Sequence, residues 1–402
     1  MRRYAHLAAA CFFFALIGCG GSNNNTQPGN NPIAGAANNV VSITAGGGSA
    51  GIANGVFTNV TVCSPGSASN CATVGGILVD TGSTGLRILS SVLPAAFTLP
   101  KQISSTGSPV GECFQFLDGF TWGPVETADV HLSGESASSI PIQIIGDPSF
   151  SGVPAACSST GTPEQDVQSL GANGILGVSN FVQDCGPACA AAGAGNPGLY
   201  YSCPAGGCTQ IAQALAQQVV HPVSAFATDN NGVIVELPAI PSSGAVNTSG
   251  SLVFGIGTQS NNGLAGASVL MVDSIGNITT LFKSQTLPKS FIDSGSNGLF
   301  FLDSTTTGIP VCADNPFYCP SSTQNLTAVN QGTNGTSTSV NFSIANADQA
   351  FSASNPNFLF SNLGAPNPGT FDWGSPFFFG RNVFTAIEGK STPGGTGPFV
   401  AY

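Results

Sequence analysis

Two short segments carry the residues that could do chemistry. Residues 77–86 read ILVDTGSTGL and residues 290–299 read SFIDSGSNGL, so an apolar stretch runs into an Asp-Thr/Ser-Gly-Ser turn in both. One such turn is weak evidence, because Asp, Gly and Ser are common in any tight turn. The likeness continues beyond the turn, however, and an internal repeat of this kind indicates two related halves of one molecule.

A facing pair of carboxyl groups could hydrolyse peptide bonds through water. Without a metal or a covalent nucleophile, the reaction needs a base that deprotonates the attacking water and an acid that protonates the developing oxyanion. Two close carboxylates cannot both ionise easily, so they share one proton and offer both functions. If the two halves bring Asp80 and Asp293 together, the pair supplies the groups that this reaction needs.

The elements that must position this pair are mostly strands. The chain has 402 residues, of which 42% are hydrophobic, enough for two lobes with a substantial core. Its 53 Gly and 27 Pro residues, together with many short apolar runs, favour strands and turns. One segment, residues 209–219, places apolar side chains at helical spacing and predicts a helix.

The charge content excludes one class of partner. Only 7% of the residues are charged and the formal net charge is −11. Such a chain has no basic surface for the phosphates of nucleic acids. We expect no nucleic acid partner.

The N-terminal residues read as an export signal. Arg2 and Arg3 precede an apolar stretch, residues 7–17, that is too short to span a bilayer and is typical of a secretory signal. The stretch ends in LIGC at residues 16–19, which resembles the lipobox of bacterial lipoproteins. This predicts a signal peptide over residues 1–18 and a lipid anchor on Cys19, with an ordinary signal peptide as the alternative.

The residues after Cys19 predict where the anchor lies. Gly20 and Gly21 follow, without the Asp of an inner-membrane retention signal, which favours the outer membrane, on its periplasmic or surface face. Residues 19–39 are rich in Gly, Asn, Ser and Pro, with almost nothing to bury, and predict a flexible tether.

Cysteine usage agrees with export. Ten cysteines remain besides Cys11 in the signal and Cys19, and an even number in an oxidising compartment predicts five disulfides. Short spacing predicts two local pairs, and elimination predicts a third: Cys63–Cys71, Cys312–Cys319 and Cys113–Cys157.

The other four cysteines allow three pairings, between which the spacing does not decide: Cys185, Cys189, Cys203 and Cys208. They lack the Cys-x-x-Cys spacing of a zinc site, and no pair of histidines lies nearby. We predict neither a metal nor another cofactor, and we assign structural roles to His131 and His221.

With both half-sites described, the chain resembles the pepsin-like aspartic peptidases. In that family an apolar-apolar-Gly segment crosses beneath each catalytic loop. Residues 173–177 (NGILG) match the first crossing segment, and residues 376–380 (PFFFG) match the second. Residues 250–255 resemble the strand that opens the second lobe, and residues 381–387 and 397–402 resemble the terminal strands.

The resemblance implies a mostly β, two-lobed fold with a central cleft between the lobes. The N-terminal lobe would comprise residues 40–227 and the C-terminal lobe residues 228–402. Each lobe would place one Asp at the floor of the cleft, where Asp80 and Asp293 would form the catalytic dyad. The neighbouring residues would brace the loops, let backbones approach and hydrogen-bond the outer carboxylate oxygens: Thr81, Gly82, Ser83, Ser294, Gly295 and Ser296.

The chain departs from the family at the rim of this cleft. Arg87 stands where the family has a Trp, and it would either favour ionised Asp80 or point away from the cleft. The expected flap, residues 114–125, contains no Tyr. Its aromatic residues are either flap or core residues, and Asp118-Gly119 could form the hairpin tip. The flap candidates are Phe114, Phe116, Asp118, Gly119, Phe120 and Trp122.

Three functional interpretations follow. The first is an exported, lipid-anchored, monomeric aspartic endopeptidase that cuts polypeptides at apolar positions and needs no cofactor. The second is a catalytically weak or inactive binding lipoprotein of the same fold. The third is a structural or adhesive surface lipoprotein. The intact Asp loops favour the first, the missing flap Tyr favours the second, and the duplicated crossing segments count against the third.

Overall fold

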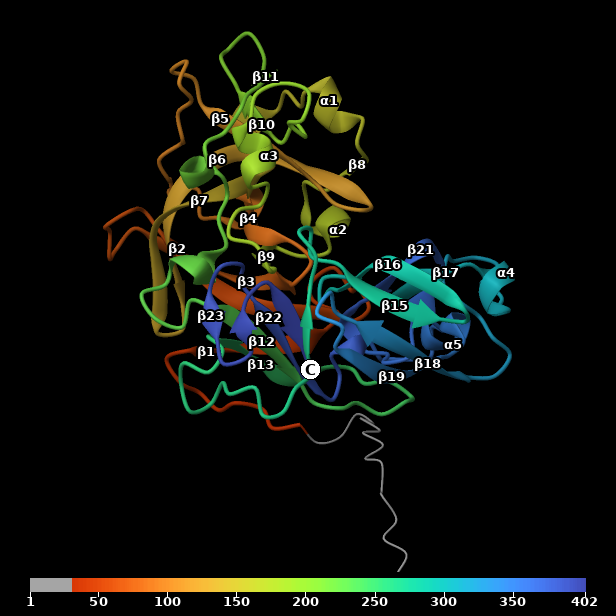
Figure 1. The fold of residues 1–402 in the computed structure, drawn as a ribbon. Coiled ribbons are helices and arrows are strands. Elements are labelled where there is room, and N and C mark those ends of the chain that lie inside the picture. Colours follow the sequence, from red (N-terminus) through yellow and green to blue (C-terminus); the bar gives the residue numbers. More distant parts are fainter. Residues whose placement is uncertain (1–30) are drawn as a thin grey trace, which may run out of the picture.

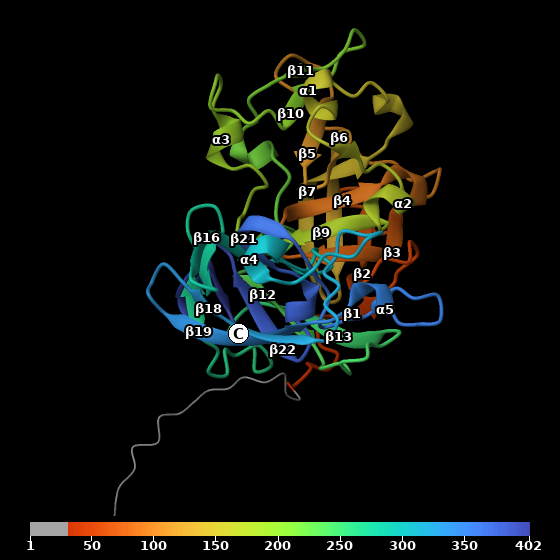
Figure 2. The ribbon, with the colours of Figure 1, turned by 90° about the vertical axis from the view of Figure 1, so that its right-hand side faces the viewer.

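The computed structural model describes residues 31–402 as a mostly β molecule with two lobes (Figures 1 and 2). The predicted signal peptide and Cys19 lie outside these residues. Part of the predicted tether lies against the body, because the Ala34 N–H donates to a Glu236 carboxylate oxygen at 2.6 Å. Across the described residues, no helix combines the length and apolar character needed to cross a membrane.

The larger sheet has 16 strands and contains nearly all of the N-terminal half. Strands from the C-terminal half join it, since β13 pairs with β1 and β12 pairs with β22. The strands of this sheet are β1 (Val40–Gly46), β2 (Gly55–Cys63), β3 (Cys71–Asp80), β4 (Thr84–Leu89), β5 (Val110–Gln115), β6 (Gly119–Leu132), β7 (Glu135–Ile145), β8 (Thr162–Pro163), β9 (Gly174–Val178), β10 (Tyr200–Ser202), β11 (Thr209–Gln210), β12 (Gly232–Leu237), β13 (Thr248–Phe254), β14 (Val269–Met271), β22 (Arg381–Ala386) and β25 (Phe399–Ala401).

A second sheet of seven strands builds the other lobe, drawn in cyan and blue in Figure 1. Its strands are β15 (Ile278–Phe282), β16 (Gln285–Ile292), β17 (Leu299–Leu302), β18 (Gln324–Gln331), β19 (Ser337–Ile344), β20 (Gly364–Ala365) and β21 (Asn367–Trp373). A short ribbon pairs β23 (Ser391–Thr392) with β24 (Gly395–Thr396). The α-helices are single turns: α1 (Ala155–Ser158), α2 (Val167–Leu170), α3 (Pro187–Ala190), α4 (Ser304–Thr307) and α5 (Ala347–Ala350).

The same three-stranded motif holds each Asp loop. In the N-terminal half, β3 runs parallel to β9 with Leu78 opposite Ile175, and β4 runs antiparallel to β9. In the C-terminal half, β16 runs parallel to β21 with Phe291 opposite Asp372, and β17 runs antiparallel to β21. The repeat seen in the sequence is therefore a repeat of strand pairing.

This register corrects the second crossing segment. Residues 372–374 (Asp-Trp-Gly) cross beneath the second loop, so the prediction for residues 376–380 is wrong. Gly374 provides the close approach, because a Cβ there would lie 2.1 Å from the Gly298 carbonyl oxygen. The apolar run misled the prediction, since its aromatic residues serve the core.

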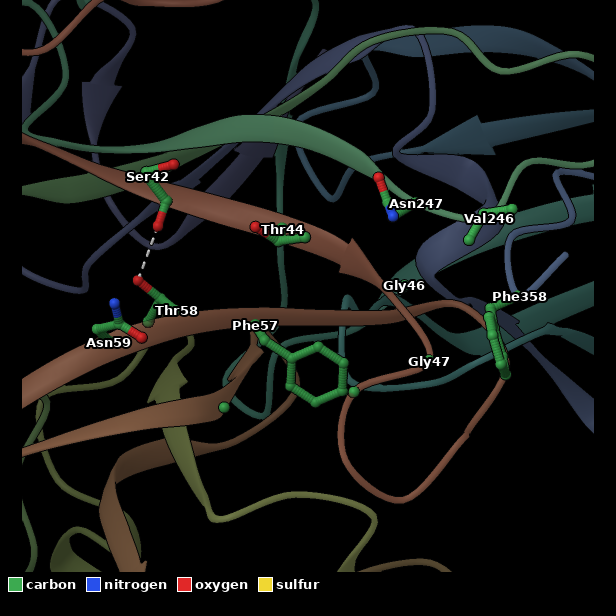
Figure 3. Close-up of a pocket in the computed structure, with 12 residues that line it drawn as sticks. Ser42, Thr44, Gly46, Gly47, Phe57, Thr58, Asn59, Val246, Asn247 and Phe358 are labelled. Carbon is green, nitrogen blue, oxygen red and sulfur yellow. Dashed lines mark hydrogen bonds between the residues drawn. The ribbon is translucent and has the colours of Figure 1, made fainter.

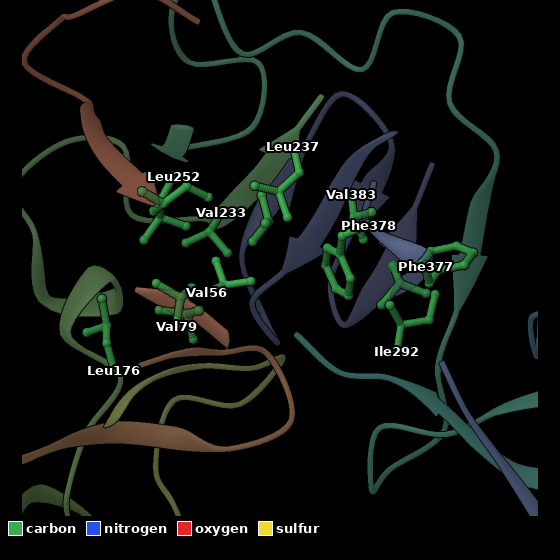
Figure 4. Packing of buried hydrophobic residues seen from close by; sticks show 14 of the residues in the cluster. Val56, Val79, Leu176, Val233, Leu237, Leu252, Ile292, Phe377, Phe378 and Val383 are labelled. Atoms are coloured by element: carbon green, nitrogen blue, oxygen red, sulfur yellow. The ribbon is translucent and has the colours of Figure 1, made fainter. Parts of the chain in front are cut away.

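That core extends through both lobes (Figure 4). Phe377 and Phe378 belong to the 3₁₀-helix Ser375–Phe377 and the turn after it, and both are buried. They pack with Ile292 and Val383 in the same cluster that contains Val79 of the first half-site. Burying an aromatic side chain of this size stabilises the fold by about 1.5–3 kcal/mol.

The helix predicted for residues 209–219 is wrong. The chain there forms β11 and one 3₁₀ turn, Leu215–Gln217. Side-chain amides replace the helical bonds, because the Gln218 amide donates to the Gln213 carbonyl oxygen at 2.9 Å. Val219 is buried in a small cluster with Tyr200, while Leu215 is 41% exposed, so the apolar spacing does not mark one helical face.

Five disulfides close the chain, as predicted. The three expected pairs are confirmed, and Cys113–Cys157 spans the longest loop, with a sequence separation of 44. The four cysteines that spacing left open form two short loops, Cys185–Cys189 and Cys203–Cys208.

Candidate active site

The two predicted Asp residues meet between the half-sites. Asp80 ends β3, and Asp293 follows β16 directly. A Cβ on Gly82 would lie 2.6 Å from Asp293 Cγ, and a Cβ on Gly295 would lie 2.7 Å from Asp80 Oδ1. Only glycine permits this approach, and it brings the two carboxyl groups within hydrogen-bonding reach of each other.

Each carboxyl group receives the same pair of hydrogen bonds. The Gly82 N–H donates to Asp80 Oδ1 at 2.7 Å, and the Ser83 hydroxyl donates to Asp80 Oδ2. In the other half-site, Asp293 Oδ1 accepts from the Gly295 N–H at 2.7 Å, and its Oδ2 accepts from the Ser296 hydroxyl at 2.8 Å. These bonds fix both carboxyl planes.

Thr81 and Ser294 lock the two loops together. The Thr81 hydroxyl donates to the Ile292 carbonyl oxygen at 3.1 Å, and the Ser294 hydroxyl donates to the Val79 carbonyl oxygen at 2.7 Å. The Thr81 N–H donates to the Ser294 hydroxyl at 3.1 Å, and the Ser294 N–H donates to the Thr81 hydroxyl at 2.9 Å. All four groups are buried, so the lobes cannot separate here without exposing unpaired polar atoms.

The electrostatics of the pair are those of carboxyls that share a proton. Burial, followed by the charge of Asp80, raises the pKa of Asp293 well above its usual range. Asp80 is 6% exposed, and Gly82 beside it is open to solvent. Water can therefore reach the two carboxyls while Asp293 holds a proton.

The predicted flap is a hairpin of β5 and β6. Gln115 pairs with Phe120, and the Phe116 N–H donates to the Gly119 carbonyl oxygen at 2.8 Å, which places Asp118 at the tip. Phe116 packs with Leu78 and Ile175, so the hairpin lies against the strands of the first half-site.

The flap aromatics divide into two groups. Phe120 and Trp122 are 2% and 1% exposed and pack around the Cys113–Cys157 disulfide, so they belong to the core. Phe114 and Phe116 are half-buried, with ring centroids 4.9 Å apart. Only the second group is partly exposed.

Arg87 does not act on Asp80. It is fully buried in β4, and its Nη2 binds Glu112 Oε1 at 2.7 Å and Asp184 Oδ2 at 3.0 Å. Its guanidinium carbon lies 3.6 Å from the ring centroid of Phe114. Of the two orientations considered from the sequence, the structure shows the one that points away.

Glu112, Asp184 and Tyr200 are partners of Arg87 that the sequence did not reveal. The Tyr200 hydroxyl donates to Asp184 Oδ1 at 2.6 Å and accepts the Val219 N–H at 2.8 Å. Burial, followed by the charge of Glu112, raises the pKa of Asp184 well above its usual range. The two carboxyl groups therefore balance one guanidinium by keeping one proton. No sequence pattern links these residues, which come from separate strands and loops.

The two lone histidines have different environments. His131 is exposed on β6, whereas His221 is fully buried, and burial lowers its pKa to about 3. His221 is therefore neutral except in strong acid.

A separate pocket of about 480 Å³ lies beside β1 and β2 (Figure 3). Phe57 and Phe358 form its aromatic walls, and the other residues that line it are Ser42, Thr44, Gly46, Gly47, Gly48, Thr58, Asn59, Gly76, Val246 and Asn247. No titratable group lines this pocket.

Comparison with known proteins identifies the family and the fold of the chain. A family model described as "Protein of unknown function (DUF3443)" matches residues 35–402. The chain belongs to the DUF3443 family. No curated protein matches the sequence.

The fold of this DUF3443 protein has a solved counterpart. The crystal structure of an aspartic proteinase from Irpex lacteus superposes with a TM-score of 0.52 and 15% sequence identity, over 90% of this chain and 96% of that chain. The predicted pepsin-like, two-lobed, mostly β fold is thereby confirmed. At this identity the match establishes the fold alone.

Within this fold, the DUF3443 chain brings together all eight residues that the motifs predicted for the Asp loops. One further carboxyl, Asp372, lies buried beneath the second loop, and the charge of Asp293 acts on it. The sequence pattern concealed Asp372 because an apolar residue was expected in the crossing segment. The only available signal was the Trp373-Gly374 pair, which ends like Leu176-Gly177.

Proposed function

We propose that this protein is an aspartic endopeptidase that hydrolyses polypeptides. The observation that carries the proposal is the mirrored bonding of Asp80 and Asp293, each held by one backbone N–H and one Ser hydroxyl across interlocked loops. This arrangement holds two carboxyls at one water-accessible point with a single proton between them.

The two carboxyls take different parts in the reaction. Asp293 holds the shared proton, as its raised pKa favours, and Asp80 is the base. Asp80 takes a proton from water as the water oxygen bonds to the peptide carbonyl carbon, and Asp293 gives its proton to the carbonyl oxygen. The resulting tetrahedral diol then collapses. Asp80 passes its proton to the leaving nitrogen as the C–N bond breaks, and a diol hydroxyl returns a proton to Asp293.

The hairpin of β5 and β6 would cover a bound polypeptide. Phe114 and Phe116 offer apolar contacts there in place of a Tyr, which supports a preference for apolar side chains near the cut bond. Arg87 holds the base of this hairpin through Glu112 on β5.

The protein would act outside the cytoplasm. Five disulfides support an oxidising compartment, and the LIGC sequence at residues 16–19 supports a lipid on Cys19 in the outer membrane. We expect a monomer that needs no cofactor.

A second candidate is a binding lipoprotein without turnover, favoured by the missing flap Tyr. Pepstatin separates the candidates, because its statine hydroxyl occupies the place of the attacking water. Calorimetric binding of pepstatin together with inhibition of casein cleavage supports the peptidase. Binding by a folded, disulfide-bonded protein that cleaves nothing supports the second candidate. Cleavage that pepstatin does not inhibit, with no pepstatin binding, would contradict the dyad as its source.

A further inference from the structure

Asp372 occupies a position that its counterpart in the other half-site fills with an apolar residue. In β21 it stands opposite Phe291, in the same register that places Ile175 of β9 opposite Leu78. Ile175 packs in a small apolar cluster with Phe57. The two half-sites therefore match in backbone but differ at this side chain by one carboxyl group.

The surroundings of Asp372 make this carboxyl costly. The residue is 2% exposed, and its Oδ1 has no hydrogen-bond partner among the described residues. Its neighbours in the strand are Phe371 and Trp373, which are stacked with ring centroids 3.8 Å apart. A buried polar group without a hydrogen-bond partner destabilises a fold, so its presence here needs another explanation.

Two polar neighbours connect Asp372 to the second Asp loop. The charge of Asp293 acts on it, and the Ser296 hydroxyl lies near enough to influence its carboxyl group. Burial and the Asp293 charge raise the pKa of Asp372 well above its usual range. Among the described residues, Asp293 is the one titratable group that disturbs it in this way.

We propose that Asp372 is a third carboxyl of the site and positions Asp293 through the hydroxyl of Ser296. A hydroxyl has one proton and two lone pairs. Ser296 uses its proton on Asp293 Oδ2 at 2.8 Å, so it can only accept from a neutral Asp372. That bond prevents the hydroxyl from turning away from Asp293.

This device makes the dyad asymmetric. Ser83 binds Asp80 as Ser296 binds Asp293, but the residue at the corresponding place beneath the first loop is Ile175. Only Asp293 therefore has a second carboxyl behind it.

The inference rests on the proposed peptidase activity, and two substitutions test it. Asp372→Ile copies the first half-site, so the melting temperature stays equal or rises while kcat falls about tenfold, the effect of losing roughly one hydrogen bond. Asp372→Asn can still donate to Ser296, so it restores part of kcat.

Asp314→Asn is the matched control, because it makes the same substitution at an exposed Asp. Wild-type kcat in both Asp372 variants would overturn the inference, and so would an equal loss of kcat in both. So would a loss of kcat in Asp372→Ile that only follows a loss of folded protein.

A second measurement separates this inference from the activity itself. A folded wild-type protein without cleavage contradicts the proposed function, and the inference is then read from thermal unfolding. The raised pKa stabilises the fold below the unfolded pKa of Asp372, and this contribution is lost as pH rises through the folded pKa. The melting temperature of Asp372→Asn therefore exceeds that of the wild type by a margin that grows as pH rises from 4 to 9.

Coupling to Asp293 decides the outcome of that measurement. If Asp372 acts with Asp293, the gain is smaller in the Asp293→Asn background, because the repelling charge has been removed. An equal gain in both backgrounds would show that Asp372 is only a buried acid of the core and would overturn the inference.

Discussion

Arg87 points away from Asp80 and leaves the hydrogen bonds of the dyad undisturbed. Its guanidinium contacts two buried carboxyl groups and the half-buried ring of Phe114. The buried guanidinium and the buried carboxyl pair depend on each other, because removing either one leaves the other as an unpaired charge in the interior.

We predict that Arg87→Met destabilises the protein by about 3–5 kcal/mol, because Glu112 and Asp184 lose their counter-ion. Chemical denaturation measures the change. Adding Glu112→Gln and Asp184→Asn to the same chain removes the unpaired charges and recovers part of the loss. A stability loss below about 1 kcal/mol in the single variant would contradict the assigned network.

At this scale the sequence predicted residues whose neighbours lie within one motif. Asp80 and its supporting Gly82 and Ser83 belong to four consecutive positions, and local geometry dictates their hydrogen bonds. Arg87 and Asp372 could not be placed in the same way. Their partners are brought to them by strand pairing between distant segments.

A further pair of carboxyl groups, Asp118 and Glu164, lies at the tip of the β5–β6 hairpin. Glu164 follows β8, and its backbone N–H donates to the Phe120 carbonyl oxygen at 2.9 Å. Burial, followed by the charge of Asp118, raises the pKa of Glu164 to about 8. The tip is therefore held by a neutral Glu164 up to mildly alkaline pH.

We predict that the tip opens when Glu164 ionises. A raised pKa stabilises the closed hairpin fully below the ordinary value near 4.5, and this stabilisation is lost as pH rises through about 8. Hydrogen exchange of residues 115–120, corrected for its intrinsic pH dependence, should accelerate above pH 8 in the wild type and not in Glu164→Gln. The same acceleration in both proteins would show that Glu164 does not hold the tip.

The elements that the sequence predicted poorly share one cause. Residues 209–219 have helical spacing, but Gln213 and Gln218 bond the backbone with their side chains, and disulfides hold the preceding loops. Such tertiary contacts outweigh the small free energies of helix propensity. The flap hairpin was predicted correctly because Asp118-Gly119 is a local turn signal.

The whole molecule is two copies of one motif joined by strands from both halves of the chain. β1 pairs with β13, and β12 pairs with β22, so neither lobe has a separate core. The repeat in the sequence revealed this architecture. The loops between the motifs, including Cys185–Cys208, could not be predicted, since their form depends on which cysteines meet.

We predict that the disulfides differ in value according to loop length. Cys113–Cys157 closes a loop of 44 residues, and its removal by paired Ser substitution should cost about 4 kcal/mol on the chain-entropy model. Cys185–Cys189 closes a loop of only 4 residues and should cost about 2 kcal/mol, which makes it the matched control. Chemical denaturation of both variants checks the order, and equal losses would contradict it.

The central claim is that Asp80 and Asp293 together hydrolyse peptide bonds. Its most direct test is cleavage of a denatured protein by the folded, disulfide-bonded chain across pH 3 to 8, beside Asp80→Asn and Asp293→Asn. We predict cleavage by the wild type alone, with melting temperatures close to wild type in both variants. Cleavage that survives either substitution, or a folded wild type that cleaves nothing, would contradict the claim.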